Sequence, residues 1–216
     1  MLIDDLIKEG WLETPRIIEA FKKIKREDFI PGEMKGDSEL NEPLSIGFDQ
    51  TISQPLTVAF MLEKLQPEPG DKILDVGSGS GWTTALLADI VSQKENSKSQ
   101  MPNSKNGKII GVEIIPELVE FGRNNVSKYN YIKKGVAEII LGDGSMGYDK
   151  EAPYDKILAS ASATELPKEW KRQLKIGGKI VAPIGSSIWL FVKKGDNEFD
   201  EREFPGFVFV PLISRR

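Results

Sequence analysis

The chain contains neither cysteine nor histidine among its 216 residues. Without cysteine it can form no disulfide, no thiolate nucleophile and no cysteine-ligated zinc or iron–sulfur site. Without histidine it lacks the Ser-His triad, the usual base at neutral pH and the commonest metal ligand. We therefore expect no metal site, and chemistry that uses carboxylates, hydroxyls, backbone groups and a bound cofactor.

A surplus of positive charge and long apolar runs are missing as well. The chain carries 29 Lys and Arg against 33 Asp and Glu, a formal net charge of −4. Nucleic acids bind to clustered positive charge, so we expect no nucleic-acid partner. No run of about 18 apolar residues occurs, so we expect no membrane-spanning helix. Since the first residues include acids and no apolar h-region, we expect no signal peptide and a cytoplasmic protein.

Strands and helices are predicted to alternate along most of the chain. The expected strands are residues 72–76, 108–113, 137–141, 154–159, 178–184, 188–192 and 207–212. The expected helices are two within residues 2–25, one from Gln54, and others at 82–91, 116–128 and 168–174. This order predicts an α/β fold, a Rossmann-like, doubly wound and mostly parallel seven-stranded sheet with helices on both faces and an N-terminal helical extension. We expect strands 188–192 and 207–212 to form an antiparallel pair that closes one edge.

Two of these helix starts are predicted from capping residues. Thr14 is a suitable N-cap because Pro15 follows it at the first helical position. Ser53 is the expected N-cap of the helix that starts at Gln54, since serine is among the preferred residues at this position.

The strongest functional signal is the sequence DVGSGSG at residues 75–81, between a predicted strand and a predicted helix. A glycine-rich turn in this place lets the backbone approach a ligand at the helix N-terminus. The same glycine spacing also occurs in plain tight turns, but the strand–turn–helix context favours a nucleotide-type site. We expect Asp75, Gly77, Ser78 and Gly79 to bind the cofactor.

Two acids follow at the ends of later strands. Glu113 ends strand 108–113 and is expected to accept hydrogen bonds from ribose hydroxyls. It lies 32 residues beyond Gly81, but only 16 once the 16-residue polar stretch 92–107 is set aside, close to the usual spacing of about 20. Asp143, within GDG at 142–144, is expected to accept from an adenine amino group. The alternative for Glu113 is a solvent-facing acid at a strand end, and the alternative for Asp143 is a common Asp-Gly turn.

The spacing of the glycines limits which class of cofactor can bind. A dinucleotide-binding domain keeps a Gly-x-Gly-x-x-Gly register, whereas this chain has Gly-x-Gly-x-Gly with an acid two residues before it. No Gly-x-x-x-x-Gly-Lys sequence occurs, which excludes a P-loop. The order acid–x–Gly–x–Gly–x–Gly resembles the first motif of the class I S-adenosylmethionine-dependent methyltransferases.

Further segments resemble one family of these enzymes, the protein-L-isoaspartate O-methyltransferases. The most specific segment is IGFDQTISQP at residues 46–55. Others are APYD at 152–155, QLKIGG at 173–178 and FVPL at 209–212. The resemblance runs from about residue 2 to residue 212, nearly the whole chain. It implies transfer of a methyl group from S-adenosyl-L-methionine to the free carboxylate of isoaspartyl residues in damaged proteins, which initiates their repair.

The resemblance also implies roles for single residues. Ser53 matches the serine that the family places at the active site, and it would act there as a catalytic and cofactor-contacting residue. Thr51, Ile52, Ile114 and Gly144 would line the cofactor. No histidine base is required, because a carboxylate with a pKa near 4 is already ionised at neutral pH. An alternative for Ser53 is that it only caps a helix.

The resemblance further implies a single domain, with residues 1–53 as helical extension and substrate loop and residues 54–216 as cofactor-binding core. Residues 92–107 are almost entirely polar, and we expect a flexible surface insert there. The substrates would be isoaspartyl proteins and peptides, and the enzyme a monomer. Asp49 replaces a common glycine of the family, so its charge is expected to repel a carboxylate substrate. Two alternatives to the isoaspartyl methyltransferase function stay open. The chain could be another class I methyltransferase or a non-catalytic cofactor-binding relative.

Overall fold

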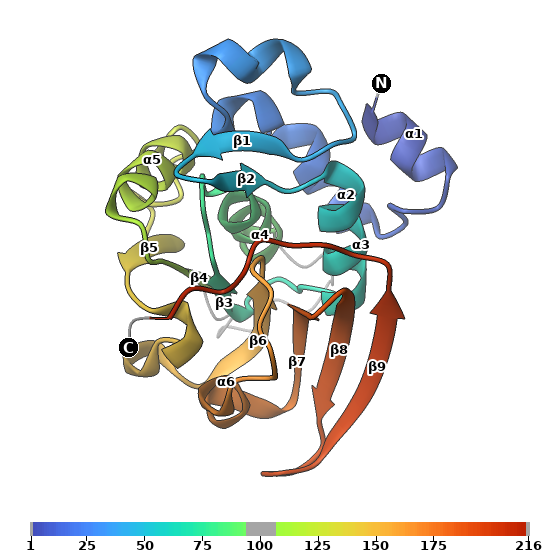
Figure 1. The fold of residues 1–216 in the computed structure, drawn as a ribbon, viewed down its shortest axis with the longest axis vertical. Coiled ribbons are helices and arrows are strands. Elements are labelled where there is room, and N and C mark those ends of the chain that lie inside the picture. The colour runs from blue at the N-terminus through green and yellow to red at the C-terminus, as the bar shows by residue number, and fades with distance from the viewer. Residues whose placement is uncertain (1, 94–106, 215–216) are drawn as a thin grey trace.

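The computed structural model describes residues 2–93 and 107–214, built around one seven-stranded sheet (Figure 1). Its order is β5-β4-β3-β6-β7-β8-β9. The first five strands run parallel, and β8 and β9 are antiparallel to their neighbours. The strands are β3 (Lys72–Val76), β4 (Lys108–Glu113), β5 (Ala137–Leu141), β6 (Tyr154–Ala159), β7 (Leu174–Ile184), β8 (Ser187–Lys193) and β9 (Phe199–Pro205). The predicted α/β fold is confirmed.

Helices cover both faces of this sheet. The central strands are therefore buried on both sides, which is why they read as short apolar runs in the sequence. One face packs against the N-terminal extension and three core helices, and the other packs against α6. The helices are α1 (Leu2–Lys8), α2 (Pro15–Lys23), α3 (Pro55–Leu65), α4 (Trp82–Ser92), α5 (Pro116–Ser127) and α6 (Lys168–Gln173). None of the described helices is long and apolar enough to cross a membrane.

The antiparallel edge differs from its prediction. Strand β9 is Phe199–Pro205, not residues 207–212, and it pairs with β8 through a register that sets Trp189 opposite Glu203. The charged sequence of β9 hides its strand character, because an edge strand can carry polar side chains on exposed positions. Residues 207–212 instead cross the sheet as an extended segment (Figure 1). Ser162 N–H donates to Val210 O at 2.8 Å and Leu212 N–H to Ser162 O at 2.8 Å.

The predicted helix caps are corrected in part. Helix α3 begins at Pro55, so its N-cap is Gln54 and the prediction of Ser53 as N-cap is wrong. Proline at the first position fixes this start, because the ring presets the helical φ. Thr14 does occupy the N-cap position of α2, but its hydroxyl donates to Glu63 Oε2 at 2.6 Å and not to its own helix.

A short hairpin lies above the sheet and was not predicted. Strands β1 (Leu44–Gly47) and β2 (Gln50–Ile52) pair antiparallel near the carboxyl ends of the parallel strands (Figure 1). Phe48 and Asp49 form its turn with φ values of 56° and 55°. Aspartate tolerates this left-handed conformation better than most residues, and a family glycine at Asp49 fits the same φ. The predicted insert 92–107 falls largely on residues 94–106, which lie outside the described residues.

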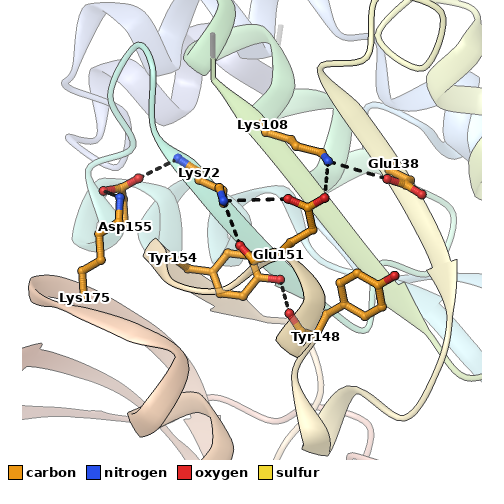
Figure 2. Close-up of polar contacts among 8 residues, drawn as sticks. All are labelled: Lys72, Lys108, Glu138, Tyr148, Glu151, Tyr154, Asp155 and Lys175. Atoms are coloured by element: carbon orange, nitrogen blue, oxygen red, sulfur yellow. Dashed lines mark hydrogen bonds and ion pairs between the residues drawn. The ribbon is translucent and has the colours of Figure 1, made fainter. Parts of the chain in front are cut away.

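The amino ends of the strands carry a network of charges (Figure 2). Lys108 Nζ lies 2.6 Å from Glu151 Oε1, and Lys72 Nζ donates to the Glu151 carbonyl at 2.9 Å. Asp155 Oδ2 accepts from the backbone N–H of Lys72 at 2.9 Å, and Lys175 Nζ binds the other oxygen of Asp155 at 2.5 Å. These contacts connect β3, β4, β6 and β7 at their amino ends, on the side of the sheet away from the hairpin.

Candidate active site

A cleft opens at the carboxyl ends of β3, β4 and β6, beneath the hairpin. It holds about 560 Å³ not occupied by atoms, part of which is open to solvent. Its walls come from the hairpin, the glycine-rich turn, the segment after β4, the segment after β6 and the extended C-terminal segment. The lining residues are Ile46, Gln50, Thr51, Gly77, Gly79, Val112, Glu113, Ile114, Ile115, Leu118, Gly144, Ser160, Ala161, Val210, Pro211, Leu212 and Ile213.

Glycines at two positions of the glycine-rich turn have positive φ and close neighbours. Gly79 has φ of 52°, and a Cβ there would lie 3.3 Å from Ile46 Cδ1 of the hairpin. Gly81 has φ of 89°, and a Cβ there would lie 2.8 Å from Val126 Cγ2 and 3.0 Å from the Gly122 carbonyl oxygen. The glycines therefore let the backbone turn tightly between β3 and α4 while the hairpin and α5 pack against it.

Glu113 links the two sides of the cleft floor. Its Oε2 accepts from Gly79 N–H at 2.9 Å, and its Oε1 accepts from the N–H groups of Ile114 and Ile115 at 2.8 and 3.0 Å. The side chain lines the cleft and is otherwise buried. Three backbone donors thus hold one carboxylate rigidly at the cleft, where it can accept further hydrogen bonds.

Asp75 lies beneath the turn and does not line the cleft. It is fully buried, and its Oδ2 accepts from the hydroxyls of Thr83 and Thr84 at 2.8 and 2.6 Å. Its Oδ1 has no hydrogen-bond partner within the described part of the chain. Burial raises the pKa of Asp75 to about 6, because a low-dielectric environment disfavours the charged form. The geometry gives Asp75 a role in fixing the start of α4.

A smaller recess adjoins the cleft and shares Thr51, Gly77, Gly79 and Ser160 with it. It holds about 280 Å³. The described residues that line it include no charged side chain and many hydroxyls. They are Thr51, Ile52, Ser53, Val58, Gly77, Ser78, Gly79, Ser80, Trp82, Thr83 and Ser160. The structure thus brings the predicted residues Thr51, Ile52, Ser53 and Ser78 to one place.

The GDG sequence contributes one residue to the wall of the cleft. Gly144 lines the cleft, whereas Asp143 does not. Asp143 Oδ1 accepts from the N–H and the hydroxyl of Ser145 at 2.9 and 2.6 Å, and so caps the 3-10 helix η3 (Gly144–Met146). The carboxylate is therefore held in a defined position next to a cleft residue.

Arg26 is a residue of this region that the sequence did not reveal. Its buried guanidinium donates from Nη2 to the carbonyl oxygens of Glu42 at 2.7 Å and Ser53 at 3.3 Å, and from Nη1 to that of Leu40 at 3.0 Å. It lies over the Trp82 ring, 5.6 Å from the centroid. Burial lowers the pKa of Arg26 to about 10, which leaves it charged at neutral pH. An arginine amid charged neighbours reads as a surface residue, so no pattern predicted these contacts.

The C-terminal segment was also missed as part of the site. Val210, Pro211, Leu212 and Ile213 line the cleft. Its FVPL sequence is predicted to lie in an edge strand, at residues 207–212. Its actual place follows from the pairing with Ser162 described above, which brings the segment across the ends of the strands.

Known proteins resemble this one over nearly its whole length. The profile of the family Protein-L-isoaspartate(D-aspartate) O-methyltransferase matches residues 1–216. A protein-L-isoaspartate O-methyltransferase of Methanopyrus kandleri is 40% identical over 98% of this chain and 89% of its own length, and one of Staphylothermus marinus is 40% identical over 98% and 92%. A Plasmodium falciparum structure assigned as this type of enzyme, solved with S-adenosyl-L-homocysteine, superposes with a TM-score of 0.85 at 25% identity, covering 99% of this chain and 97% of that one.

Proposed function

The chain belongs to the protein-L-isoaspartate(D-aspartate) O-methyltransferase family, and we propose how its own residues carry out the family's reaction. It is an S-adenosylmethionine-dependent methyltransferase that acts on the free carboxylate of isoaspartyl residues in damaged proteins. We assign the cleft to the cofactor and the adjoining recess to the substrate carboxylate. The observation that carries this division is the shared wall of the two spaces, which includes Thr51 and Gly79.

The residues of the cleft fit the cofactor. The glycine-rich turn leaves its backbone open to a ligand, and the carboxylate of Glu113 is held ready to accept from ribose hydroxyls. Ile114, Leu118 and Gly144 offer apolar surface to an adenine ring, and Asp143 is the acceptor for its amino group. When bound, S-adenosylmethionine supplies a methyl group on a cationic sulfonium. The apolar C-terminal segment excludes water from that site.

The recess can bind an anionic substrate group although no basic side chain lines it. The isoaspartyl carboxylate is already ionised at neutral pH, so the enzyme does not have to remove a proton. Hydroxyl groups can donate hydrogen bonds to it, and the N-terminus of α4 adds the partial positive charge of its backbone amides. We assign the principal donor role to Ser53, whose backbone carbonyl is held by Arg26. Orientation of the carboxylate toward the methyl group then accounts for catalysis.

The family assignment supports further proposals about the whole protein. Residues 1–53 act as extension and substrate loop, and residues 54–216 form the cofactor-binding core. The partners are isoaspartyl proteins and peptides and not nucleic acids, in keeping with the net charge of −4. We propose that the enzyme works as a monomer in the cytoplasm.

Ser53→Ala tests the assignment of the recess. Because the hydroxyl would act on the carboxylate in the transition state, turnover of an isoaspartyl peptide should fall by about 100-fold, as for other lost anion-stabilising donors. The dissociation constant for S-adenosylhomocysteine should change much less. Ser45→Ala is the control, since Ser45 lies exposed on the hairpin that precedes Ser53 and does not line the recess. Full turnover in the Ser53→Ala variant would show that another group holds the carboxylate.

A further inference from the structure

Helix α6 ends in a residue that the site described above does not use. Gln173, the first residue of the QLKIGG sequence, is 1% exposed and lies outside both cavities. Its Oε1 accepts from Tyr148 N–H at 2.9 Å, and its Nε2 donates to the Met146 carbonyl at 2.9 Å. A Cβ on Gly147, which has φ of 62°, would lie only 2.3 Å from Gln173 Oε1. The side-chain amide is therefore fitted closely against the segment 144–148.

A second side chain of α6 holds the same segment at its other end. Trp170 is fully buried, and its indole Nε1 donates to the Gly144 carbonyl at 2.8 Å. The backbone of Gly144 is also a wall of the cofactor cleft. Residues that do not line the cleft thus make three hydrogen bonds to the segment that contributes Gly144 to its wall.

The position of Asp143 depends on this segment. Its Oδ1 accepts from the N–H and hydroxyl of Ser145, and Met146 N–H donates to the Asp143 carbonyl at 3.1 Å. These hydrogen bonds couple the position of the Asp143 carboxylate to that of η3. Since Trp170 and Gln173 of α6 hold η3, α6 also fixes the orientation of Asp143 toward a ligand.

We propose that Trp170 and Gln173 are positioning residues for adenine recognition, which act by holding the segment 143–148 in its ligand-binding shape. The proposal rests on the proposed function, because it takes Asp143 as the acceptor for the adenine amino group. It predicts a specific defect when these side chains lose their hydrogen bonds. The enzyme should bind the cofactor less tightly and distinguish adenine less well, while the substrate recess stays unaffected.

The test compares two ligands across two variants. Trp170→Phe keeps an aromatic side chain, although a smaller one, and removes the N–H donor. Gln173→Met keeps the chain length and removes both hydrogen bonds. Each protein is titrated by calorimetry, well below its melting temperature, with S-adenosylhomocysteine and with S-inosylhomocysteine, which carries an oxygen in place of the amino group. A merely structural role would lower the melting temperature without changing the ratio of the two dissociation constants.

Lys193→Met is the matched control. Lys193 is buried, and its Nζ donates to the carbonyls of Lys171 and Leu174 at 2.7 and 2.9 Å, so it anchors the same end of α6 without touching the segment 143–148. This variant should lose thermal stability and keep both dissociation constants.

We expect the dissociation constant for S-adenosylhomocysteine to rise about three- to tenfold in each test variant, the range for a lost hydrogen bond. The constant for S-inosylhomocysteine should rise less, and the KM for an isoaspartyl peptide should not change. If Gln173→Met does not fold, Trp170→Phe alone decides. Unchanged affinity in the test variants, or an equal loss in Lys193→Met, would overturn the positioning role. A wild-type protein that does not bind S-adenosylhomocysteine would instead contradict the proposed function itself.

Discussion

At the scale of single residues, Glu113 shows how the fold prepares a site before a ligand binds. Three backbone N–H groups hold its carboxylate, one from the glycine-rich turn and two from the segment after β4. In the proposed cofactor site, a ligand would therefore meet an acceptor whose orientation is already fixed, which would lower the entropic cost of binding.

Glu113→Ala should therefore weaken S-adenosylhomocysteine binding by about 1.5–3 kcal/mol, the range for a hydrogen bond to a charged group. Isothermal titration calorimetry measures the change, and Glu117→Ala serves as control because Glu117 is exposed nearby on α5. An affinity equal to that of the wild type would assign Glu113 a purely structural role in the turn.

Asp75 should make folding stability depend on pH. Its pKa is about 6 in the folded protein against an ordinary value of 3.8 for an aspartate, so the folded state favours the protonated form. Its contribution is therefore most favourable below pH 3.8 and is lost as pH rises through 6. A difference of about two pKa units corresponds to about 3 kcal/mol.

The Asp75→Asn variant removes this titration. Urea unfolding at pH 4 and pH 7 should show the variant gaining stability relative to wild type by up to about 3 kcal/mol at the higher pH. A stability difference that is the same at both pH values would mean that Asp75 is not desolvated as described.

The candidate site could be predicted from sequence only where its residues share a local pattern. The turn at 75–81, Glu113 and Gly144 lie at strand ends in the order that the fold class dictates. Of the predicted site residues, all line the cleft or the recess except Asp75 and Asp143. Arg26 could not be found in this way. Its partners lie 12 to 27 residues further along the chain and are backbone carbonyls, which leave no mark in the amino-acid sequence.

At the scale of elements, prediction depended on burial. Strands β3 to β6 were predicted at their observed bounds. Strands β3, β4 and β6 are buried along nearly their whole length, which demands apolar side chains, whereas the edge strand β5 mixes buried and exposed residues. Strand β9 exposes most of its side chains, and the strands of the hairpin are short and mix buried with exposed residues, so their sequences carry no such signal. Their places depend on turns and on neighbouring strands, which a linear pattern does not record.

Arg26 holds the chain on both sides of the hairpin, through the carbonyls of Glu42 and Ser53, and Arg26→Met should release it. Loss of its hydrogen bonds to buried carbonyls should reduce the free energy of unfolding by at least about 2 kcal/mol, and turnover should fall because Ser53 loses its anchor. Denaturant unfolding and peptide turnover measure the two effects.

Arg16→Met is the control for this element. Arg16 ties α2 to the carbonyl of Pro67 at 2.7 Å and to Gln66 Oε1 at 2.8 Å, away from the recess. It should lower stability and spare turnover. Full turnover in Arg26→Met at a temperature where the variant is folded would contradict the link between Arg26 and catalysis.

At the scale of the whole molecule, the carboxyl ends and the amino ends of the parallel strands have different roles. Ligands of open α/β sheets bind at the carboxyl ends of the strands, and here the cleft and the recess share those ends beneath the hairpin. The amino ends hold ion pairs and hydrogen bonds among Lys72, Lys108, Glu151, Asp155 and Lys175 (Figure 2). Rigidity at the amino ends leaves the carboxyl ends free to carry loops that bind ligands.

The central claim is that this fold brings a methyl donor and an isoaspartyl carboxylate together. The most direct measurement supplies labelled S-adenosylmethionine with a pair of peptides that differ only in carrying isoaspartate or normal aspartate at one position. We predict transfer of label to the isoaspartyl peptide, followed by its loss as the ester closes to a succinimide, and no transfer to the aspartyl twin. Equal labelling of both peptides, or no labelling by a protein that binds the cofactor, would contradict this function.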